Sequence, residues 1–198
     1  MINERRLVDL FLKYVQIDSE SRKEENFREV LEQDLRELGM DVTADEAGNL
    51  FFALDGDEKA EPLLFTAHMD TVVPGQSIRP VMENGVIKSG GDTVLGGDDK
   101  SGIAAIVEAI QVMKEEKIPH RRVEVLFTVE EEIGLNGSRA ADLGQVRSRY
   151  SIAMDGCGPM DEIVVNGAGQ ANVEIEITGV AAHAGNSPEK GVSAVIAA

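Results

Sequence analysis

Near the start of the chain, hydrophobic residues recur at intervals of three and four, the spacing of one face of a helix. Leu7, Leu10 and Tyr14 follow this spacing. A second run of the same kind extends from about residue 23 to residue 38, and Gly39 follows it. Glycine is common just after a helix because it adopts a positive φ angle without strain. The pattern therefore predicts two amphipathic helices, the second ending at Gly39.

Apolar runs farther along the chain predict the strands of a buried sheet. They lie at residues 49–54, 62–67, 123–129 and 150–154. The second run, PLLFTA, does not alternate, as expected of a strand that is covered on both faces. Between the second and third runs, residues 100–117 repeat apolar positions at helical spacing. Strands that alternate with helices predict an α/β fold with a central, mostly parallel sheet flanked by helices.

The pattern changes after about residue 160. Residues 162–165 and 171–178 alternate polar and apolar positions, which is typical of antiparallel strands with one polar face. The final apolar run looks like a helix that has no C-cap. We therefore expect one domain over residues 1–165 and the truncated beginning of a smaller α+β domain over residues 166–198.

Composition narrows the classes of partner. The chain has 36 acidic and 19 basic residues, a formal net charge of −17, which disfavours nucleic acid as a partner. Its single cysteine, Cys157, excludes an internal disulfide and agrees with a reducing compartment. The sequence has neither a signal-peptide pattern nor an apolar stretch long enough to cross a membrane. We expect a cytoplasmic protein that does not bind membranes.

Acidic side chains and one histidine come directly after the predicted strands. His68 and Asp70 follow the second strand, and Asp98 lies in a glycine-rich turn before the third helix. The glutamates at 130–132 end the third strand, and Asp155 ends the fourth. In open α/β sheets, ligands gather beyond the carboxyl ends of the strands. We therefore expect these groups to converge on one edge of the sheet.

So many neighbouring carboxylates would repel one another and take up protons unless cations were present. One imidazole with several carboxylates, and no thiolate, suits zinc, manganese or cobalt in a hydrolytic site. Several carboxylates can hold two ions about 3.5–4 Å apart, with a water between them. The residues therefore predict a two-metal hydrolytic centre that holds zinc, manganese or cobalt.

Five stretches resemble the motifs of one family of zinc peptidases. They are residues 65–72 (FTAHMDTV), 95–102 (LGGDDKSG), 127–134 (FTVEEEIG), 153–156 (AMDG) and 179–185 (GVAAHAG). The family includes peptidase T, bacterial dipeptidases, aminoacylase and succinyl-diaminopimelate desuccinylase. Each motif alone is weak, but their order and setting make the resemblance specific. It covers nearly the whole chain and is greatest for the peptidase T group.

The resemblance implies a role for each matched residue. His68 matches the imidazole ligand of the first ion, and Asp70 matches the carboxylate that orients this imidazole. Asp98 matches the carboxylate that bridges both ions, and in the family a cis peptide bond follows it. Asp155 matches the remaining carboxylate on the first ion. Asp98 and Asp99 could also be a helix N-cap pair, and both interpretations can hold together.

The glutamate triplet and the last histidine complete the matched set. Glu131 matches the general base and Glu132 a ligand of the second ion, with a shift of one residue as the alternative. His183 resembles the lid histidine that, in dimeric relatives, reaches the partner's site and polarises the scissile carbonyl. The family's final ligand is a histidine near the end of a longer chain. None of the three histidines here, His68, His120 and His183, stands in that position. The resemblance therefore implies that this chain holds the second ion poorly.

The resemblance implies the function of a metal-dependent exopeptidase, an aminotripeptidase-like hydrolase that uses a water bridging two zinc ions. Residues 1–165 would be the N-terminal part of its catalytic domain. Residues 166–198 would begin a lid domain through which two chains form a homodimer. The expected partner is a short peptide substrate.

Three alternatives stand beside this function, and the second of them conflicts with the spacing of the motifs. An N-acyl amino acid deacylase of the same family would share these motifs. In tetrahedral aminopeptidases the lid is inserted between the first histidine and the bridging aspartate. Here that interval, from His68 to Asp98, is too short for a domain. A non-catalytic metal-binding or dimerisation module is the third alternative.

Overall fold

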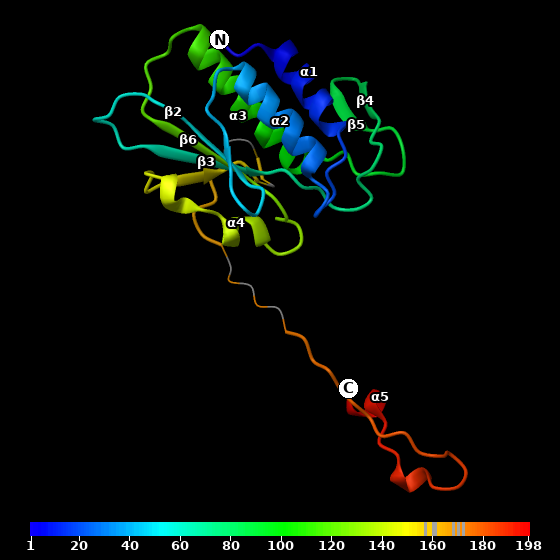
Figure 1. Ribbon diagram of the computed structural model, residues 1–198. Coiled ribbons are helices and arrows are strands. Elements are labelled where there is room, and N and C mark those ends of the chain that lie inside the picture. The colour runs from blue at the N-terminus through cyan, green and yellow to red at the C-terminus, as the bar shows by residue number, and fades with distance from the viewer. Residues whose placement is uncertain (157, 160–161, 168, 170, 172) are drawn as a thin grey trace. The chain divides into compact units, whose positions relative to one another are not determined.

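A computed structural model describes residues 1–156, 158–159, 162–167, 169, 171 and 173–198 of the chain (Figure 1). Two compact units are distinguished, Met1–Gly158 and Pro159–Ala198, and each is described by itself. Cys157 lies outside the described residues. No helix among the residues that are described is both long enough and apolar enough to cross a membrane.

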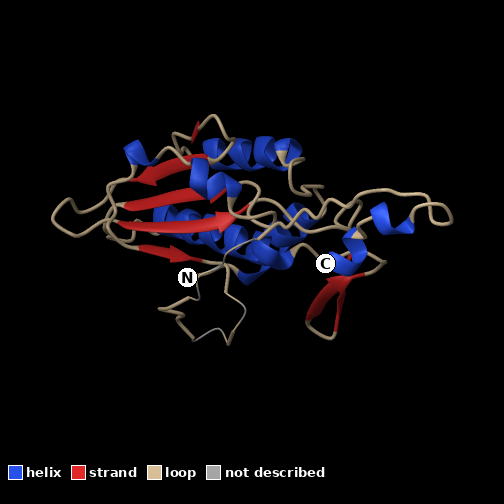
Figure 2. Ribbon diagram, turned by 90° about the horizontal axis from the view of Figure 1, so that it is seen from below, coloured by secondary structure: helices blue, strands red, loops and turns tan. Residues whose placement is uncertain are grey.

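A five-stranded sheet forms the centre of the first unit, and its strands lie beside one another in a single layer (Figure 2). In sheet order the strands are β1 (Thr43–Ala44), β2 (Leu50–Leu54), β6 (Val123–Thr128), β3 (Leu63–His68) and β7 (Ser151–Ala153). β3 runs parallel to both β6 and β7, whereas β2 runs antiparallel to β6 and to β1. The predicted α/β fold is confirmed, and the parallel part of its mixed sheet is the β6–β3–β7 side.

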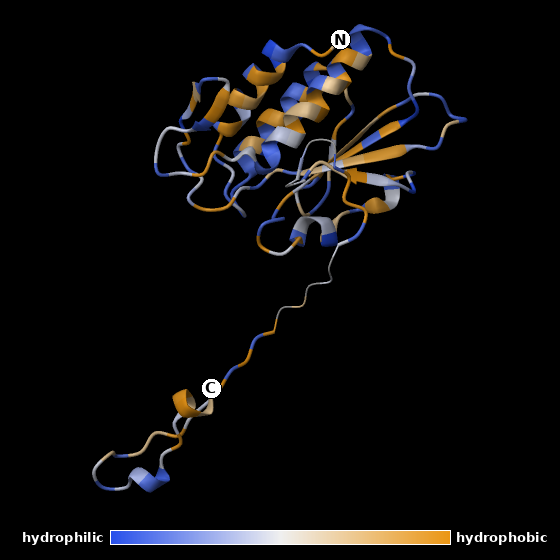
Figure 3. Cartoon of the chain, turned by 180° about the vertical axis from the view of Figure 1, so that it is seen from behind, coloured by the Kyte–Doolittle hydropathy of each residue, from blue (hydrophilic) through white to orange (hydrophobic). Residues whose placement is uncertain are grey.

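Three long helices cover one face of the sheet (Figure 1). They are α1 (Glu4–Val15), α2 (Glu25–Glu37) and α3 (Gly97–Glu115). Alternate residues of the strands face these helices, so that Leu50 and Phe52 of β2 belong to the main core while Phe51 faces the other way. Figure 3 shows the central strands as largely hydrophobic and the helices as amphipathic. This packing buries the apolar faces that the sequence pattern predicted.

The helix ends follow local chemistry. Asn3 is the N-cap of α1, and its side chain accepts a hydrogen bond from the N–H of Arg6 at 3.1 Å. α2 ends just before Gly39, whose φ angle of 73° lies in the left-handed region that favours glycine. Both helices that the periodicity predicted are therefore confirmed, as is the glycine stop.

The opposite face of the sheet carries a smaller apolar cluster of Phe51, Leu64 and Leu126. The short helix α4 (Asn136–Ala140) and the 3₁₀ turn η1 (Leu143–Gln145) follow β6 along the chain. A separate antiparallel hairpin of β4 (Pro80–Glu83) and β5 (Val86–Ser89) lies between β3 and α3 along the chain.

The residues of the second unit that the structure describes hold little regular structure. It contains the 3₁₀ turn η2 (Pro188–Lys190), the short helix α5 (Ala194–Ala197) and one antiparallel bridge between Val180 and Val192. The strands expected at 162–165 and 171–178 are not formed by the described residues of those ranges, and residue 172 lies outside them. An alternating segment becomes a strand only when a neighbour pairs with it. Among the described residues of this unit, such pairing is confined to Val180 and Val192.

Candidate metal centre

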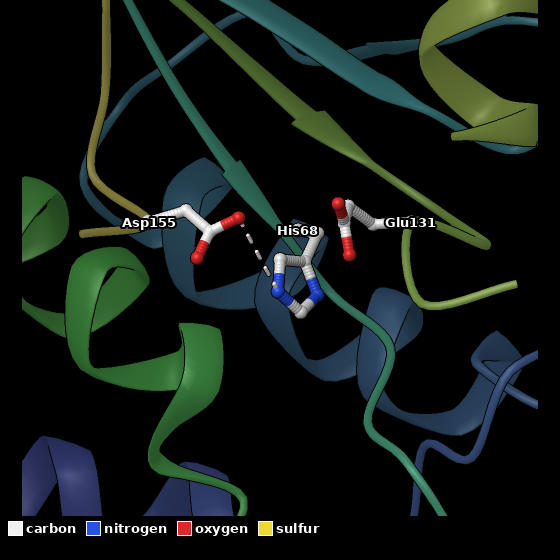
Figure 4. A group of neighbouring side chains, drawn as sticks. All are labelled: His68, Glu131 and Asp155. Carbon is white, nitrogen blue, oxygen red and sulfur yellow. Dashed lines mark ion pairs between the residues drawn. The ribbon is translucent and has the colours of Figure 1, made fainter. Parts of the chain in front are cut away.

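The ends of neighbouring strands bring the predicted site residues together. His68 is the last residue of β3 and pairs with Thr128, the last residue of β6. β7 ends at Ala153, shortly before Asp155, and Asp98 lies in the first turn of α3. Figure 4 shows His68 between the side chains of Glu131 and Asp155, which come from separate segments of the chain. The convergence on one edge of the sheet is therefore observed.

Two groups of side chains have ligand atoms that all lie within 4.8 Å of one another. One group is His68, Glu131 and Asp155, and the other is His68, Asp98 and Glu132. Nε2 of His68 lies 3.0 Å from Oδ1 of Asp98 and 4.0 Å from Oδ2 of Asp155. His68 is thus common to both groups, and it is almost completely buried.

Asp70 fixes the orientation of the His68 ring. Nδ1 of His68 lies 2.9 Å from the backbone oxygen of Asp70 and 3.4 Å from its Oδ1. A proton on Nδ1 can therefore be donated to Asp70, which leaves Nε2 facing the other acids. Burial by itself lowers the pKa of His68, but hydrogen bonds with Asp70 and Asp98 and the charge of nearby aspartates outweigh it and raise the pKa to about 10.

The carboxylate of Asp70 has more partners than the sequence predicted. It is fully buried and accepts hydrogen bonds from Oγ of Ser21 at 2.7 Å and from the N–H groups of Glu131 and Glu132 at 2.9 and 3.2 Å. Burial raises the pKa of Asp70, but the bonds from His68, Ser21 and these N–H groups more than offset it, so the pKa is lowered. Asp70 therefore stays negative while it joins β3 to the glutamate triplet.

The pKa values of Glu131, Glu132 and Asp155 are shifted in the opposite direction, upward. Burial is the largest cause that raises the pKa values of Glu131, Glu132 and Asp155, and the charge of Asp98 raises each of them further. His68 opposes this shift in all three. Carboxylates that are crowded in this way are stabilised by a cation. One imidazole nitrogen with carboxylate oxygens around it is also a donor set that suits zinc, so the residues present fit a divalent metal.

The turn into α3 has the backbone that the resemblance implied. The peptide bond between Asp98 and Asp99 is cis. Asp99 is buried, and its Oδ1 accepts the N–H of Gly102 at 3.1 Å, as a helix cap does. A Cβ atom at Gly102 would lie 2.3 Å from that oxygen, so the cap requires glycine there. Burial raises the pKa of Asp99 to about 7.

His183 belongs to the second unit, so its relation to the other site residues stays a prediction. Within its own unit, Nδ1 of His183 accepts the N–H groups of Gly185 and Asn186, both at 3.1 Å. This places the ring proton on Nε2.

Comparisons with known proteins show which family and which solved structures this chain resembles. The model of a family described as "Peptidase family M28" matches residues 49–192. An uncharacterized protein of Bacillus subtilis, YqjE, is 46% identical over 98% of this chain and 55% of its own length. The crystal structure of aminopeptidase PepT from Bacillus cereus superposes with a TM-score of 0.82 and 40% identity, over 98% of this chain and 55% of that one.

A tripeptidase structure from Staphylococcus aureus has a TM-score of 0.80 and 34% identity, over 99% of this chain and 55% of the tripeptidase. This chain therefore spans about half the length of these three proteins.

Proposed function

This chain belongs to peptidase family M28, and on that premise we propose that it is part of a metal-dependent exopeptidase that acts on short peptides. The observation that carries the proposal is the meeting of one imidazole and four carboxylates at the carboxyl edge of the sheet. Similarity to an aminopeptidase and to a tripeptidase supports an aminotripeptidase in particular. Zinc is the proposed metal, with manganese or cobalt as substitutes.

The proposed roles keep those implied by the resemblance. His68, Asp98 and Asp155 would hold a first ion, and Asp98 and Glu132 would hold a second. Glu131 is the proposed general base. Its carboxylate lies in the same group as His68 and Asp155, so it would be within reach of a water held on the first ion.

A divalent cation, when bound, supplies Lewis acidity, which makes water a stronger acid and polarises a carbonyl. Glu131 accepts a proton from the attacking water while the water oxygen bonds to the carbonyl carbon of the peptide. The bond between that carbon and the peptide nitrogen then breaks, and Glu131 returns the proton to the departing amine. Asp70 keeps the ring of His68 oriented through these steps, because Nδ1 faces Asp70.

Several parts of the proposal concern the whole protein. Residues 1–165 would belong to the catalytic domain, and residues 166–198 would begin a lid domain. His183 would reach the active site of a partner subunit in a homodimer and stabilise charge on the carbonyl oxygen. The single cysteine supports a cytoplasmic location.

The test measures hydrolysis of tripeptides, dipeptides and N-acyl amino acids by the full-length protein in the presence of zinc. We expect Glu131→Gln to lower kcat for a tripeptide by about 10²–10⁴-fold while zinc is still bound. Glu130→Gln is the matched control, because Glu130 is in neither group of candidate ligands. Unchanged activity of Glu131→Gln would remove Glu131 from the mechanism, and a loss in Glu130→Gln instead would favour the shifted register.

The same panel separates the alternatives. Faster turnover of N-acyl amino acids than of any peptide would identify a deacylase. Stoichiometric zinc without turnover of any substrate would identify a non-catalytic metal-binding module.

A further inference from the structure

The segment that carries the acidic triplet leaves the sheet at the end of β6. The ladder between β3 and β6 stops at the pair His68 and Thr128. The N–H groups of residues 129–132 come next and lie beyond that ladder. Buried N–H groups need acceptors, and here all four donate to side-chain oxygens.

Three buried residues from different parts of the chain supply these oxygens. The N–H of Val129 donates to Oδ1 of Asn49, and the N–H of Glu130 donates to Oε1 of Glu24, both at 3.1 Å. The next two N–H groups donate to the carboxylate of Asp70. The start of α2, the start of β2 and the end of β3 therefore all hold this one segment.

The segment needs this support because two of its consecutive side chains must point to the same centre. In an extended strand, consecutive side chains point to opposite faces. Glu131 and Glu132 are consecutive, yet each contributes an oxygen to a group that includes His68. The chain turns just before them, at Glu130, whose φ angle of 51° lies in the left-handed region that few non-glycine residues adopt. The position of both glutamates therefore depends on how firmly the backbone of Glu130 is held.

The side chain that holds the backbone of Glu130 is that of Glu24, which accepts its N–H. Only 5% of Glu24 is exposed, at the start of α2, and a buried carboxylate is costly unless it is hydrogen-bonded. Asn49 is not specific to this segment, because its amide also donates to the backbone oxygen of Gly137 and to the carboxylate of Asp45. The carboxylate of Glu24 is directed at the backbone of Glu130 and at N–H groups of its own loop.

We infer that Glu24 is a positioning residue for this centre: by accepting the N–H of Glu130, it maintains the turn that directs Glu131 and Glu132 to the same metal pair. The inference rests on the proposed function, since it concerns the base and the metal ligand named there. Glu24 acts through the backbone and touches neither the peptide nor the metal.

The test titrates the full-length protein with zinc and measures tripeptide hydrolysis. Glu24→Ala removes the acceptor, and we expect zinc affinity and kcat each to fall by about 10–100-fold. KM should stay within about twofold, because no contact with the peptide is lost. Glu24→Gln keeps an oxygen at the same distance and should restore zinc affinity and kcat to within about threefold of the wild type.

Glu124 provides the matched structural control. It is a fully buried carboxylate near the start of β6, and it accepts the N–H groups of Arg147 and Ser148, each at 3.0 Å. Glu124→Ala should lower the urea midpoint of unfolding without changing zinc affinity. Glu24→Ala would be purely structural, and the inference overturned, if it lowered the midpoint in the same way and left zinc affinity and kcat unchanged.

A second variant and the behaviour of the wild type distinguish a misfolded variant, a wrong role for Glu24 and a wrong proposed function. If Glu24→Ala does not fold, Glu24→Asp, which retains the charge but shortens the side chain, should show the same loss of affinity and kcat; wild-type values would overturn the inference. If the wild-type protein itself neither binds zinc nor hydrolyses tripeptides, the proposed function fails. If the wild type does both and the Glu24 variants match it, only the role of Glu24 fails.

Discussion

Ser21 contributes to the centre although it belongs to none of the motifs. Its hydroxyl, in the loop between α1 and α2, donates to Oδ2 of Asp70 across 49 positions of sequence. The same carboxylate faces Nδ1 of His68 and holds the N–H groups of Glu131 and Glu132. A change at Ser21 should therefore reach the proposed metal ligands through Asp70.

We predict that Ser21→Ala weakens zinc binding by about tenfold, because a lost outer-shell bond leaves Asp70 less firmly placed against His68. Isothermal titration of the full-length protein with zinc measures this. Ser19→Ala is the control in the same loop, since the hydroxyl of Ser19 is buried without a hydrogen-bond partner among the described residues. Equal zinc affinity in the two variants would contradict the prediction.

At the scale of elements, a partly buried ion pair between Arg6 and Glu108 joins α1 to α3. Nε and Nη2 of Arg6 lie 2.5 and 3.0 Å from the two carboxylate oxygens of Glu108, which also accepts the N–H of Asn3 at 2.8 Å. The side chain of Glu108 is only 1% exposed. Burial raises the pKa of Glu108, but the bonds from Arg6 and Asn3 and the charge of Arg6 outweigh it, so the pKa is lowered.

This shift predicts how stability depends on pH. The unfolded chain has the ordinary glutamate pKa of about 4.3, above the folded value, so the stabilisation is complete above about pH 4.3 and is lost as the pH falls through the folded pKa. At pH 7 we expect Glu108→Gln to lower the free energy of unfolding by about 1–3 kcal/mol. Urea unfolding should show the gap between variant and wild type closing in acid.

Glu115→Gln is the control for this pair. Glu115 also contacts Arg6, at 2.8 Å, but its side chain is 50% exposed, so its loss should matter less at every pH. A gap between Glu108→Gln and the wild type that stays constant from neutral pH into acid would contradict the assigned pKa shift.

The elements also show what the sequence could predict and what it could not. α1, α2, α3, β3 and β6 have strong periodicity or long apolar runs, and all were predicted. The antiparallel direction of β2 was not, because a strand's direction depends on its connections rather than on its own residues. The candidate ligands followed from the rule that sites lie beyond strand ends. Ser21 and Glu24 could not be predicted, because only the folded loop brings them to Asp70 and Glu130.

At the scale of the whole molecule, folding brings negatively charged carboxylates together, so it must overcome their mutual repulsion. The chain has a net charge of −17, and the fold gathers four of its carboxylates around His68. Burial and mutual repulsion raise the pKa values of Glu131, Glu132 and Asp155. A cation that binds the folded state relieves this repulsion, whereas the unfolded chain keeps these acids apart and gains little from it.

We therefore predict that zinc stabilises the fold. At a free zinc concentration of 100 times the dissociation constant, the gain is about 2.7 kcal/mol. In the full-length protein this gain should raise the Tm by a few °C, and a chelator should reverse the rise. Differential scanning calorimetry of the full-length protein with and without zinc measures it.

Sodium chloride and His68→Ala separate site binding from general screening. Salt screens the whole acidic surface, so it should raise the Tm of the wild type and of His68→Ala alike. Zinc should raise the Tm of the wild type but not that of His68→Ala, because Nε2 of His68 is the one nitrogen donor shared by both candidate ligand groups. An equal zinc effect on both proteins would mean that zinc acts through the overall charge of −17 rather than through the centre.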